Sequence, residues 1–466
     1  MDRLIDRHAN DSPLPIGSPD MLHDLDGDTL GCTSRLHRTY GPIVGYRKGS
    51  DLTVFCCGAE AGYAVFSEPD TFHVFGHPGT KNTAQRRFGL GLFGINGAVQ
   101  RQHRRLLMPA VRKEAVEASA EAMSQVIDEF LGEWRVGQRI DLYAAMKELS
   151  LRVAGRLLFG LDDFAVARDV AVAFQNWLDN YITAVFALSL PVTMPAARYQ
   201  RWLEAGNRME VYLKQLIKLR RSHLRDGQHD LLALLLRACD AGQISESEVI
   251  GEMQTLFNAS YQTTASGLTW TLLLLTQHPG VLRRLNDDWR SGEHSDLLDR
   301  VIRESLRVLS PVVFVMRRSV RPSVIGRHSL PEGTVVFHNL YMTHHLPELF
   351  PQPERFDPDR WSWQHVSPFT YAPFAAGPRM CLGATFSLQL FQVAVPAILR
   401  RFRLVMAPGT AVIRHSSLTL GVDGSLPVTL QAPDGRFTVV PLTGNIHEMV
   451  ELPYAPMPAT APAKAA

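Results

Sequence analysis

Apolar residues return at helical spacing along most of this chain. Between residues 116 and 237 they recur every three or four positions, as at Met123, Val126 and Phe130. A second helical pattern begins near Ser245-Glu-Ser-Glu248 and runs from Val249 to about Gln277, and Pro279 ends it. A third covers the apolar run from Leu388 to Leu399. The pattern predicts a mainly helical protein.

Strand signals are fewer and shorter. Ile43–Tyr46 and Leu52–Cys56 alternate around a polar turn and predict a hairpin, although no Asn-Gly or Asp-Gly pair marks the turn. Residues 323–325 and 335–337 predict two more short strands. The β structure is therefore expected to form a smaller region beside the helices.

A glycine-rich stretch from residue 71 to 97 has no clear period. Apolar side chains on a mobile loop suit a lid over an apolar ligand, but the same side chains could only anchor the loop to the core. The apolar segment 177–188, which contains Phe186, likewise suits either a pocket roof or plain core. From the glycine-rich stretch the candidates for pocket contacts are Phe75, Phe88, Leu92 and Phe93.

Composition narrows the class of protein. The chain has 466 residues, 45% of them hydrophobic and 20% charged, and its net charge of +2 argues against a nucleic-acid surface. Its five cysteines show no pairing pattern, which fits a reducing compartment. The first residues contain no apolar signal segment or membrane anchor, so we expect a cytoplasmic protein. Residues 453–466 are rich in Pro and Ala and predict a disordered tail.

One cysteine lies in the most informative stretch, Tyr371-Ala-Pro-Phe374-Ala-Ala-Gly377-Pro-Arg379-Met-Cys381-Leu-Gly383. A loop that leads into a helix supplies backbone donors and the positive end of a helix dipole, which both favour a thiolate. The glycines allow a backbone turn or the close approach of a flat group. Arg379 could pair with a carboxylate of that group. These properties suit a cysteine that ligates haem iron, whereas a lone cysteine at a helix start is more often inert.

The spacing Phe374-x-x-Gly377-x-Arg379-x-Cys381-x-Gly383 resembles the haem-binding signature of the cytochrome P450 family, with every fixed position filled. The resemblance implies haem b with Cys381 as the axial iron ligand and Arg379 on a haem propionate.

Other haem contacts follow from the same resemblance. The basic run that begins at Gln100 matches a helix whose Trp or His and whose Arg reach a propionate; Arg104 matches, and Gln100 departs but can still donate a hydrogen bond. Alternatively, this run is a solvated charged face, and its other arginines could receive an acidic electron donor. Arg317 is expected at a propionate too, although a register slip would exchange it with Arg318. Val312, Val313 and Phe314 would face the substrate.

The middle of the long helix carries small and hydroxylated residues, which can bond back to helix carbonyls and open a groove. Ala259-Ser260-Tyr261-Gln262-Thr263-Thr264 resembles the oxygen-activation motif of the family, with Thr263 at the alcohol position. Ser260 stands where the family has Gly, and Gln262 stands where it has a carboxylate. Thr264 joins Thr263, Gln262 and Ser260 as a candidate catalytic residue, and Ala259 is expected to contact the substrate.

Gln262 leaves two interpretations open. Because an amide does not titrate in water, Ser260, Thr263 and ordered waters could carry the protons while Gln262 positions a water. Alternatively, the reaction could need no proton relay, as in redox-neutral or nitrogen-group-transfer chemistry at haem.

Glu304 and Arg307 lie three residues apart on one predicted helix face, which alone is a weak signal of a surface ion pair. Downstream, Pro353-Glu354-Arg355-Phe356 resembles the family segment whose arginine joins them. A buried network of Glu304, Arg307 and Arg355 is expected, because an unpaired buried charge is unfavourable by several kcal/mol.

Length alone suggests two or three domains, but the resemblance, from about residue 13 to 442, implies one haem domain over residues 1–452 with a mainly α cytochrome P450 fold and a smaller β-rich region. The implied function is haem-thiolate monooxygenation of an apolar small molecule, in secondary metabolism or lipid-like chemistry. No flavin or ferredoxin segment is recognisable, so electrons would come from a ferredoxin and its reductase, or from a flavodoxin-type donor. A further alternative is a non-catalytic haem protein.

Overall fold

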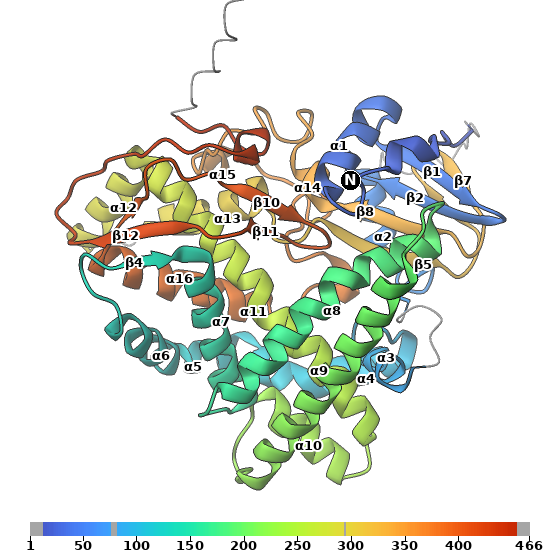
Figure 1. Ribbon diagram of the computed structural model, residues 1–466, viewed down its shortest axis with the longest axis horizontal. Coiled ribbons are helices and arrows are strands. Elements are labelled where there is room, and N and C mark those ends of the chain that lie inside the picture. Colours follow the sequence, from blue (N-terminus) through green and yellow to red (C-terminus); the bar gives the residue numbers. More distant parts are fainter. Residues whose placement is uncertain (1–12, 76–81, 293–294, 454–466) are drawn as a thin grey trace, which may run out of the picture.

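The computed structural model describes residues 13–75, 82–292 and 295–453. Helices form most of the molecule, and short sheets lie along the upper part of Figure 1. One hydrophobic core includes residues from Leu22 near the start to Leu452 near the end. No helix in these ranges is both long and apolar enough to cross a membrane. The fold is therefore mainly α with a smaller β region, as predicted.

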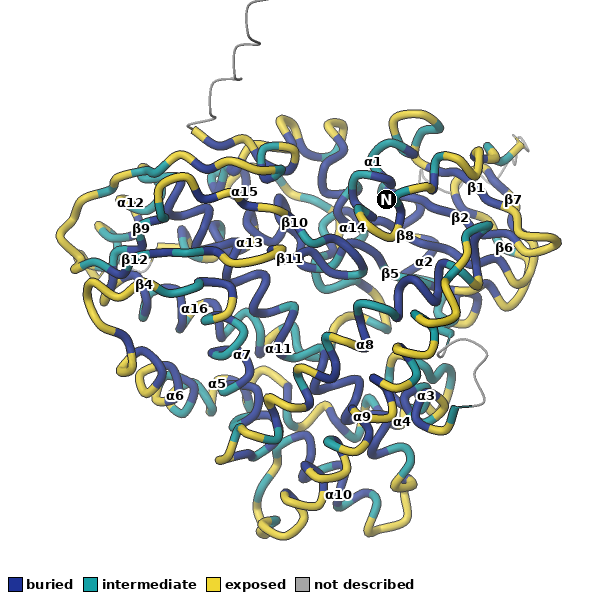
Figure 2. The backbone as a smooth tube through the Cα atoms, viewed as in Figure 1, coloured by how far each residue is buried: buried dark blue, intermediate teal, exposed yellow. Residues whose placement is uncertain are grey.

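The longest helix, α11 (Glu246–Gln277), runs through the middle of the fold (Figures 1 and 2). Ser245 accepts a hydrogen bond from the Glu248 N–H and the Glu248 carboxylate accepts one from the Ser245 N–H, which together form the capping box that fixes its start. The predicted bounds of this helix are confirmed.

Around α11 pack the other helices. Their bounds are α1 (Thr29–Tyr40), α2 (Ala59–Ser67), α3 (Thr83–Phe88), α4 (Gly97–Val111), α5 (Lys113–Ala118), α6 (Ala120–Gly132), α7 (Leu142–Phe159), α8 (Ala165–Ser189), α9 (Ala196–Ser222), α10 (Leu231–Asp240), α12 (Pro279–Ser291), α13 (Leu297–Val308), α14 (Leu340–His344), α15 (Arg360–Trp363) and α16 (Ala384–Arg401), with short 3-10 helices at Pro19–Leu22, Gly377–Arg379 and Asn445–Glu448.

The main sheet has five strands in the order β1-β2-β8-β5-β3, and three smaller sheets pair β4-β12-β9, β10-β11 and β6-β7. The predicted hairpin is its edge: Ile43 pairs with Cys56 and Lys48 with Asp51. The strands are β1 (Ile43–Lys48), β2 (Asp51–Cys56), β3 (Phe72–His73), β4 (Arg139–Asp141), β5 (Phe314–Ser319), β6 (Ser323–Ile325), β7 (His328–Leu330), β8 (Val335–Asn339), β9 (Arg403–Met406), β10 (Ile413–Ser416), β11 (Leu420–Asp423) and β12 (Pro427–Gln431).

The glycine-rich stretch is more regular than predicted. It contains β3 and α3, and the side chain of Asn82 caps α3 by accepting the Gln85 N–H. A Cβ on Gly91 would lie 2.3 Å from the Gly251 carbonyl oxygen, so this glycine lets the stretch pack directly on α11. The stretch is thus fastened to the core where it is described. The part of the lid prediction at 76–81, and the tail prediction at 454–466, fall outside the described residues.

Candidate functional site

The Cys381 loop is held by its own backbone. The Cys381 N–H donates to the Phe374 carbonyl over 2.8 Å, and the 3-10 turn Gly377–Arg379 lies between them. Helix α16 begins at Ala384, with Gly383 as its N-cap residue. The cysteine thus lies at the positive end of a helix of 18 residues, in the position that the sequence predicted.

The sulfur of Cys381 has an unusual environment. Protein atoms surround Cys381 densely, but the residue is accessible to solvent. Burial raises the pKa of the Cys381 thiol, whereas a hydrogen bond from the Gly383 backbone and the charge of Arg104 lower it. A cysteine that protein atoms surround densely, but that stays accessible and has a positive neighbour, suits a metal-bound thiolate, because metal binding removes the proton.

The two glycines of the loop differ in what they permit. Gly377 has a φ of +68°, and a Cβ there would lie 2.3 Å from the Phe66 carbonyl oxygen, so only glycine fits. A Cβ on Gly383 would meet no protein atom within 4 Å. Protein packing therefore does not require glycine at 383, and a flat group lying against the loop would.

Three arginines converge near the cysteine without an acidic partner. Arg379 and Arg317 are brought together by the loop and by β5, and Arg104 comes from α4. Burial and the charge of Arg379 lower the pKa of Arg317 to about 9. Burial and the charge of Arg104 lower the pKa of Arg379 to about 10. None of the three forms an ion pair with a carboxylate within the described ranges.

The hydrogen bonds that these arginines make leave some of their N–H groups without an acceptor among the described residues. Arg379 donates to the Ile95 carbonyl and the Asn96 side chain, both at 2.7 Å, and Arg317 donates to the Met316 carbonyl over 2.8 Å. The Nε atoms of both arginines are buried and have no partner in the described part of the chain. Such a set fits a dianion such as a haem with its two propionates.

The neighbouring positions follow the expected pattern. Arg317 is buried and Arg318 is exposed, so of these two neighbours it is Arg317 that turns inward. Gln100 lies one turn before Arg104 on α4 and is only 7% exposed. Phe374 is partly buried against the core. All residues predicted to bind the cofactor therefore lie on three elements that meet: α4, β5 and the Cys381 loop.

On α11, all residues between Val249 and Gln277 are buried except Ala259, Ser260 and Thr263. Their spacing places them on one side of the helix. The Thr263 hydroxyl donates to the Ala259 carbonyl over 3.0 Å and the Ser260 hydroxyl to the Phe257 carbonyl over 2.8 Å, as the sequence suggested for this stretch. The small and hydroxylated residues thus form the one open patch of a buried helix.

Other residues of this part of α11 contact neighbouring helices. The Thr264 hydroxyl lies 3.3 Å from the Ser387 hydroxyl of α16, and a Cβ on Gly267 would lie 2.6 Å from the Phe391 ring. These contacts fix α11 against the helix that follows Cys381. Gln262 is buried and contacts α8 through Gln175.

The apolar residues predicted to contact a substrate do not form one group. Phe88, Phe186, Val313 and Phe314 are at most 1% exposed, because neighbouring side chains cover them. Phe186 and Phe314 pack on Phe337, at ring-centre distances of 5.5 and 6.0 Å, and Phe88 packs on Trp177. They pack within the core, and their contact with a substrate stays a prediction.

The rest of that set divides further. Phe93 is 63% exposed, and its contact with a substrate stays a prediction. Phe75, Leu92, Ala259 and Val312 keep intermediate exposure. These four remain candidates for contact with a ligand.

The Glu304 network differs from the prediction in one member. Glu304 and Arg307 pair through two hydrogen bonds of 2.8 and 3.0 Å, and both side chains are 0% exposed. The third arginine is Arg360, which is 2% exposed and donates to Glu304 over 3.3 Å. Arg355 is exposed and contributes only its backbone carbonyl, which accepts from Arg307. The run Pro358-Asp359-Arg360-Trp361 repeats the Pro-acid-Arg-aromatic pattern of residues 353–356, and only this second copy starts a helix that turns its arginine inward.

Sequence analysis missed a buried acid–base cluster between α4 and α11. His103 is 1% exposed and lies 2.8 Å from Glu252 and 3.3 Å from Glu248. Burial lowers the pKa of His103, but the hydrogen bonds and charges of Glu252 and Glu248 outweigh it and the net shift is upward. In the sequence, the only sign of this cluster is a histidine inside a basic run. The two glutamates that pair with it lie some 150 residues further along the chain.

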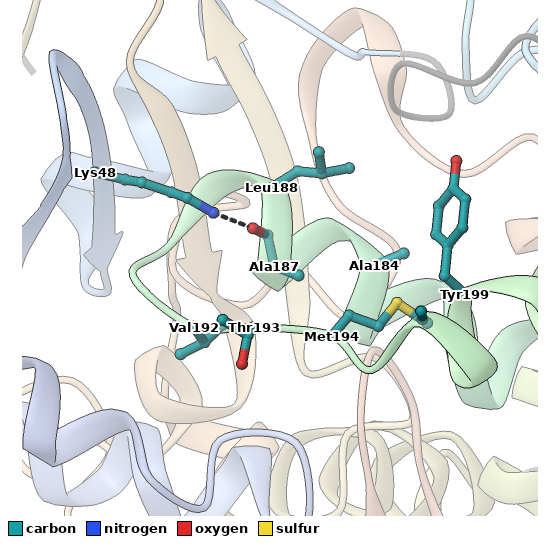
Figure 3. A pocket seen from close by; sticks show the side chains of 9 residues that line it. Lys48, Ala184, Ala187, Leu188, Val192, Thr193, Met194 and Tyr199 are labelled. Carbon is teal, nitrogen blue, oxygen red and sulfur yellow. Dashed lines mark hydrogen bonds between the residues drawn. The ribbon is translucent and has the colours of Figure 1, made fainter.

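A surface cavity of about 470 Å³ lies away from these motifs. It is formed by the end of α8, the start of α9 and the loop between them, and Lys48 closes one side by donating to the Ala187 carbonyl (Figure 3). It contains none of the motif residues, so we do not place the chemistry there.

Comparison with known proteins agrees with this geometry. A family model described as Cytochrome P450 matches residues 23–426. Cyclooctat-9-en-7-ol 5-monooxygenase of Streptomyces melanosporofaciens is 30% identical, over 80% of this chain and 84% of its own length. A putative cytochrome P450 135B1 of Mycobacterium bovis is 31% identical, over 77% of this chain and 79% of its own.

Solved structures are similar as well. Retinoic acid-bound cyanobacterial CYP120A1 superposes with a TM-score of 0.75 at 24% identity, covering 91% of this chain and 99% of the other. CYP175A1 from Thermus thermophillus gives 0.71 at 25% identity, covering 90% and 100%. The matched family model spans the Cys381 loop, α11 and the Glu304 network alike, and the chain belongs to the cytochrome P450 family of haem-dependent, oxygen-incorporating oxidoreductases.

Proposed function

We propose that this protein is a haem-thiolate monooxygenase in which Cys381 ligates the iron of haem b and one oxygen atom enters an apolar small molecule. The observation that carries the proposal is the accessible Cys381 beside three arginines that have no carboxylate partner among the described residues. A single haem domain over residues 1–452 is part of the proposal.

The residues divide the work of holding the cofactor. Arg104, Arg317 and Arg379 would bind the propionates, and Gln100 would add a hydrogen bond from α4. Gly383 leaves room for the ring, and the Gly383 N–H hydrogen-bonds the thiolate. Haem with a thiolate ligand supplies electron donation that favours O–O cleavage.

Ala259, Ser260 and Thr263 form the open patch of α11. The hydroxyls of Ser260 and Thr263 bond to helix carbonyls and keep lone pairs free, so they can accept and pass a proton. The buried apolar residues around them exclude bulk water. Thr264 holds the helix in place and stays away from the reacting atoms.

The substrate is proposed to be an apolar secondary metabolite. The four partly accessible residues Phe75, Leu92, Ala259 and Val312 offer apolar contacts only. The Streptomyces relative acts, by its name, on cyclooctat-9-en-7-ol, and a second relative is named cyclooctatin synthase at 28% identity. We propose a substrate of the same kind, a hydrocarbon-rich ring compound.

Electrons would come from a ferredoxin and its reductase. Arg101 and Arg105 are exposed on α4, the helix that carries Arg104 beside Cys381. An acidic donor could therefore dock within one helix of the cofactor, and the association rate should fall as salt increases.

Two measurements test the proposal. The purified protein should contain haem, and its ferrous carbonyl form should show the strongly red-shifted Soret band of a thiolate ligand, which a histidine-ligated haem lacks. Candidate ring terpenoids should then shift the ferric Soret band, and a surrogate ferredoxin system should give products that are 16 mass units heavier by mass spectrometry, about the mass of one oxygen atom. A protein that carries no haem, or has no thiolate band when folded, overturns the proposal.

A second function is kept because Gln262 replaces the usual carboxylate. Redox-neutral or nitrogen-group-transfer chemistry at the same haem would need no acid at 262. Turnover of a substrate in the absence of reductant and dioxygen would favour this second function over the first.

A further inference from the structure

A chain of three side chains connects α11 with α8. The Gln262 amide nitrogen donates to the Gln175 carbonyl oxygen over 3.1 Å, and the Gln175 amide nitrogen donates to the Asp179 carboxylate over 2.6 Å. Gln262 is 4% exposed. Its carbonyl oxygen has no hydrogen-bond partner in the described part of the chain.

Chemistry fixes the direction of this chain. An ionised carboxylate only accepts hydrogen bonds, so Gln175 must turn its NH₂ group to Asp179 and its carbonyl to Gln262. Gln262 must then turn its NH₂ group to Gln175, and its carbonyl oxygen is left free. Asp179 therefore determines which way both amide groups are turned. Without its carboxylate, the amides of Gln175 and Gln262 could both be turned the other way.

A second free acceptor lies on the same face of α11. Asn258 is one turn before Gln262 and 5% exposed, and its side-chain oxygen also lacks a partner among the described residues. Buried acceptor oxygens are as a rule satisfied, and water is the usual donor where protein supplies none. Asn258 is next in sequence to Ala259 and Gln262 is next to Thr263, two residues of the open patch of the helix.

We propose that Asp179 is a positioning residue for proton delivery: through Gln175 it holds the Gln262 carbonyl oxygen free to accept a hydrogen bond from a relay water between Gln262 and the Thr263 hydroxyl. The inference rests on the proposed monooxygenase function. That reaction consumes dioxygen, two electrons from the ferredoxin-type donor and two protons from bulk water, and it yields one hydroxylated product and one water. The relay water passes those two protons and is reprotonated from solvent.

Other charged and titratable groups surround Asp179. Tyr143 of α7 and Tyr261 of α11 lie close enough for its charge to add to the upward pKa shift that burial gives each phenol. Arg198 of α9 donates to the Asp179 backbone carbonyl over 2.9 Å. Both tyrosines therefore stay neutral at physiological pH.

The test compares two matched variants of the holoenzyme. Asp179→Asn keeps the shape of the side chain, but the amide groups of Gln175 and Gln262 can then be turned either way. Asp169→Asn is the control, since Asp169 lies exposed on the same helix and the net charge changes equally. Asp179→Glu and the double variant Asp179→Asn/Gln262→Glu complete the set, and haem content and circular dichroism verify that each one folds.

The first readout needs no substrate. Carbon monoxide bound to the ferrous protein is the probe, and its C–O stretching band reports nearby hydrogen-bond donors. Asp179→Asn should add a second band, because a reversed Gln262 amide presents an N–H group in place of the carbonyl, whereas Asp169→Asn should keep the wild-type spectrum.

The second readout is the product formed per reductant consumed, with the substrate from the screen above. It should fall about tenfold in Asp179→Asn, less than the roughly 100-fold or greater loss typical of removing an acid–base group, because only positioning is affected, and hydrogen peroxide should rise. The solvent isotope effect should grow. Asp179→Glu, and a carboxylate at position 262 in the double variant, should restore coupling.

Identical carbonyl bands and identical coupling in Asp179→Asn and Asp169→Asn overturn the inference while the proposed function stands. Loss of coupling that neither Asp179→Glu nor the double variant restores also overturns it, because it shows a structural role. Absence of the thiolate carbonyl band in wild type refutes the proposed function itself, and the inference with it.

Discussion

Two sets of buried arginines lie in this fold, and they differ in what faces them. Arg307 and Arg360 surround Glu304, and backbone carbonyls take up their remaining donors: His344 and Pro353 accept from Arg307, and Pro351 accepts from Arg360. Arg104, Arg317 and Arg379 surround no carboxylate, and two of their Nε atoms lack any partner among the described residues.

The difference shows which charges serve the fold and which await a ligand. A buried cation is unfavourable unless it is paired, so the first set is complete within the protein and the second is completed only by an anion from outside. Burial, and then the charge of a neighbouring arginine, lowers the pKa values of Arg317 and Arg379 for the same reason. Substitutions in the two sets should therefore fail in different ways.

Replacing Cys381 removes the centre of the second set and should have the largest effect on function. Cys381→Ser should abolish the red-shifted carbonyl Soret band and lower product formation to background, because serine does not supply a thiolate to iron. Carbonyl difference spectra and product assays measure this, with circular dichroism to show an intact fold. A retained thiolate band would mean that another cysteine is the ligand.

Glu304→Gln breaks the complete set. Arg307 and Arg360 would stay buried with no anion, so the free energy of unfolding should fall by about 3–5 kcal/mol. Urea denaturation of the holoenzyme measures this. Arg355→Ala is the matched control and should change stability by no more than about 0.5 kcal/mol, because its side chain is exposed. A large effect of Arg355→Ala would restore the network that the sequence had predicted.

Arg317→Leu should act on the cofactor more than on the fold. Loss of one charge-assisted hydrogen bond to a propionate should speed haem release about tenfold, equivalent to ~1.4 kcal/mol. Transfer of haem to excess apomyoglobin gives the rate. Arg318→Leu is the control, because that side chain is exposed and lies over the Phe75 ring at 5.2 Å. Equal rates for both variants would place the propionates elsewhere.

His103, Glu248 and Glu252 form a charged cluster whose members pair with one another. The protonation of His103 changes with pH. Because the folded-state pKa of His103 is raised above its unfolded value, its contribution to stability is fully present below about pH 6.5 and is lost as pH rises through the folded-state pKa. His103→Gln should therefore destabilise by about 1–2 kcal/mol at pH 6 and by less at pH 9. Urea unfolding at both values measures the difference, and a pH-independent loss would indicate packing alone.

Sequence was a good guide where local chemistry determines structure. The start of α11 follows from Ser245 and Glu248, and its end from Pro279, because capping and proline act within a few residues. The Cys381 loop was located by the spacing of its glycines and arginine. The family, and hence the fold, followed from that spacing.

Sequence was a poor guide where a tertiary contact decides between equal candidates. Residues 353–356 and 358–361 carry the same pattern, and only the fold shows that Arg360 is the one buried on Glu304. Phe186 and Phe314 looked as suitable for a pocket as Val312, but packing on Phe337 covers them. The pairing of His103 with Glu252 could not be predicted, because nothing local links positions 149 residues apart.

The hydroxyl contact between Thr264 and Ser387 and the close approach of Gly267 to Phe391 join α11 directly to α16. The helix that carries Thr263 and the helix that follows Cys381 are thus held against each other. Moving them apart to admit a new substrate would break these contacts. Changes in substrate preference should instead arise at partly exposed residues on other segments, such as Phe75, Leu92 and Val312. Laboratory evolution of this enzyme is therefore best directed at those positions.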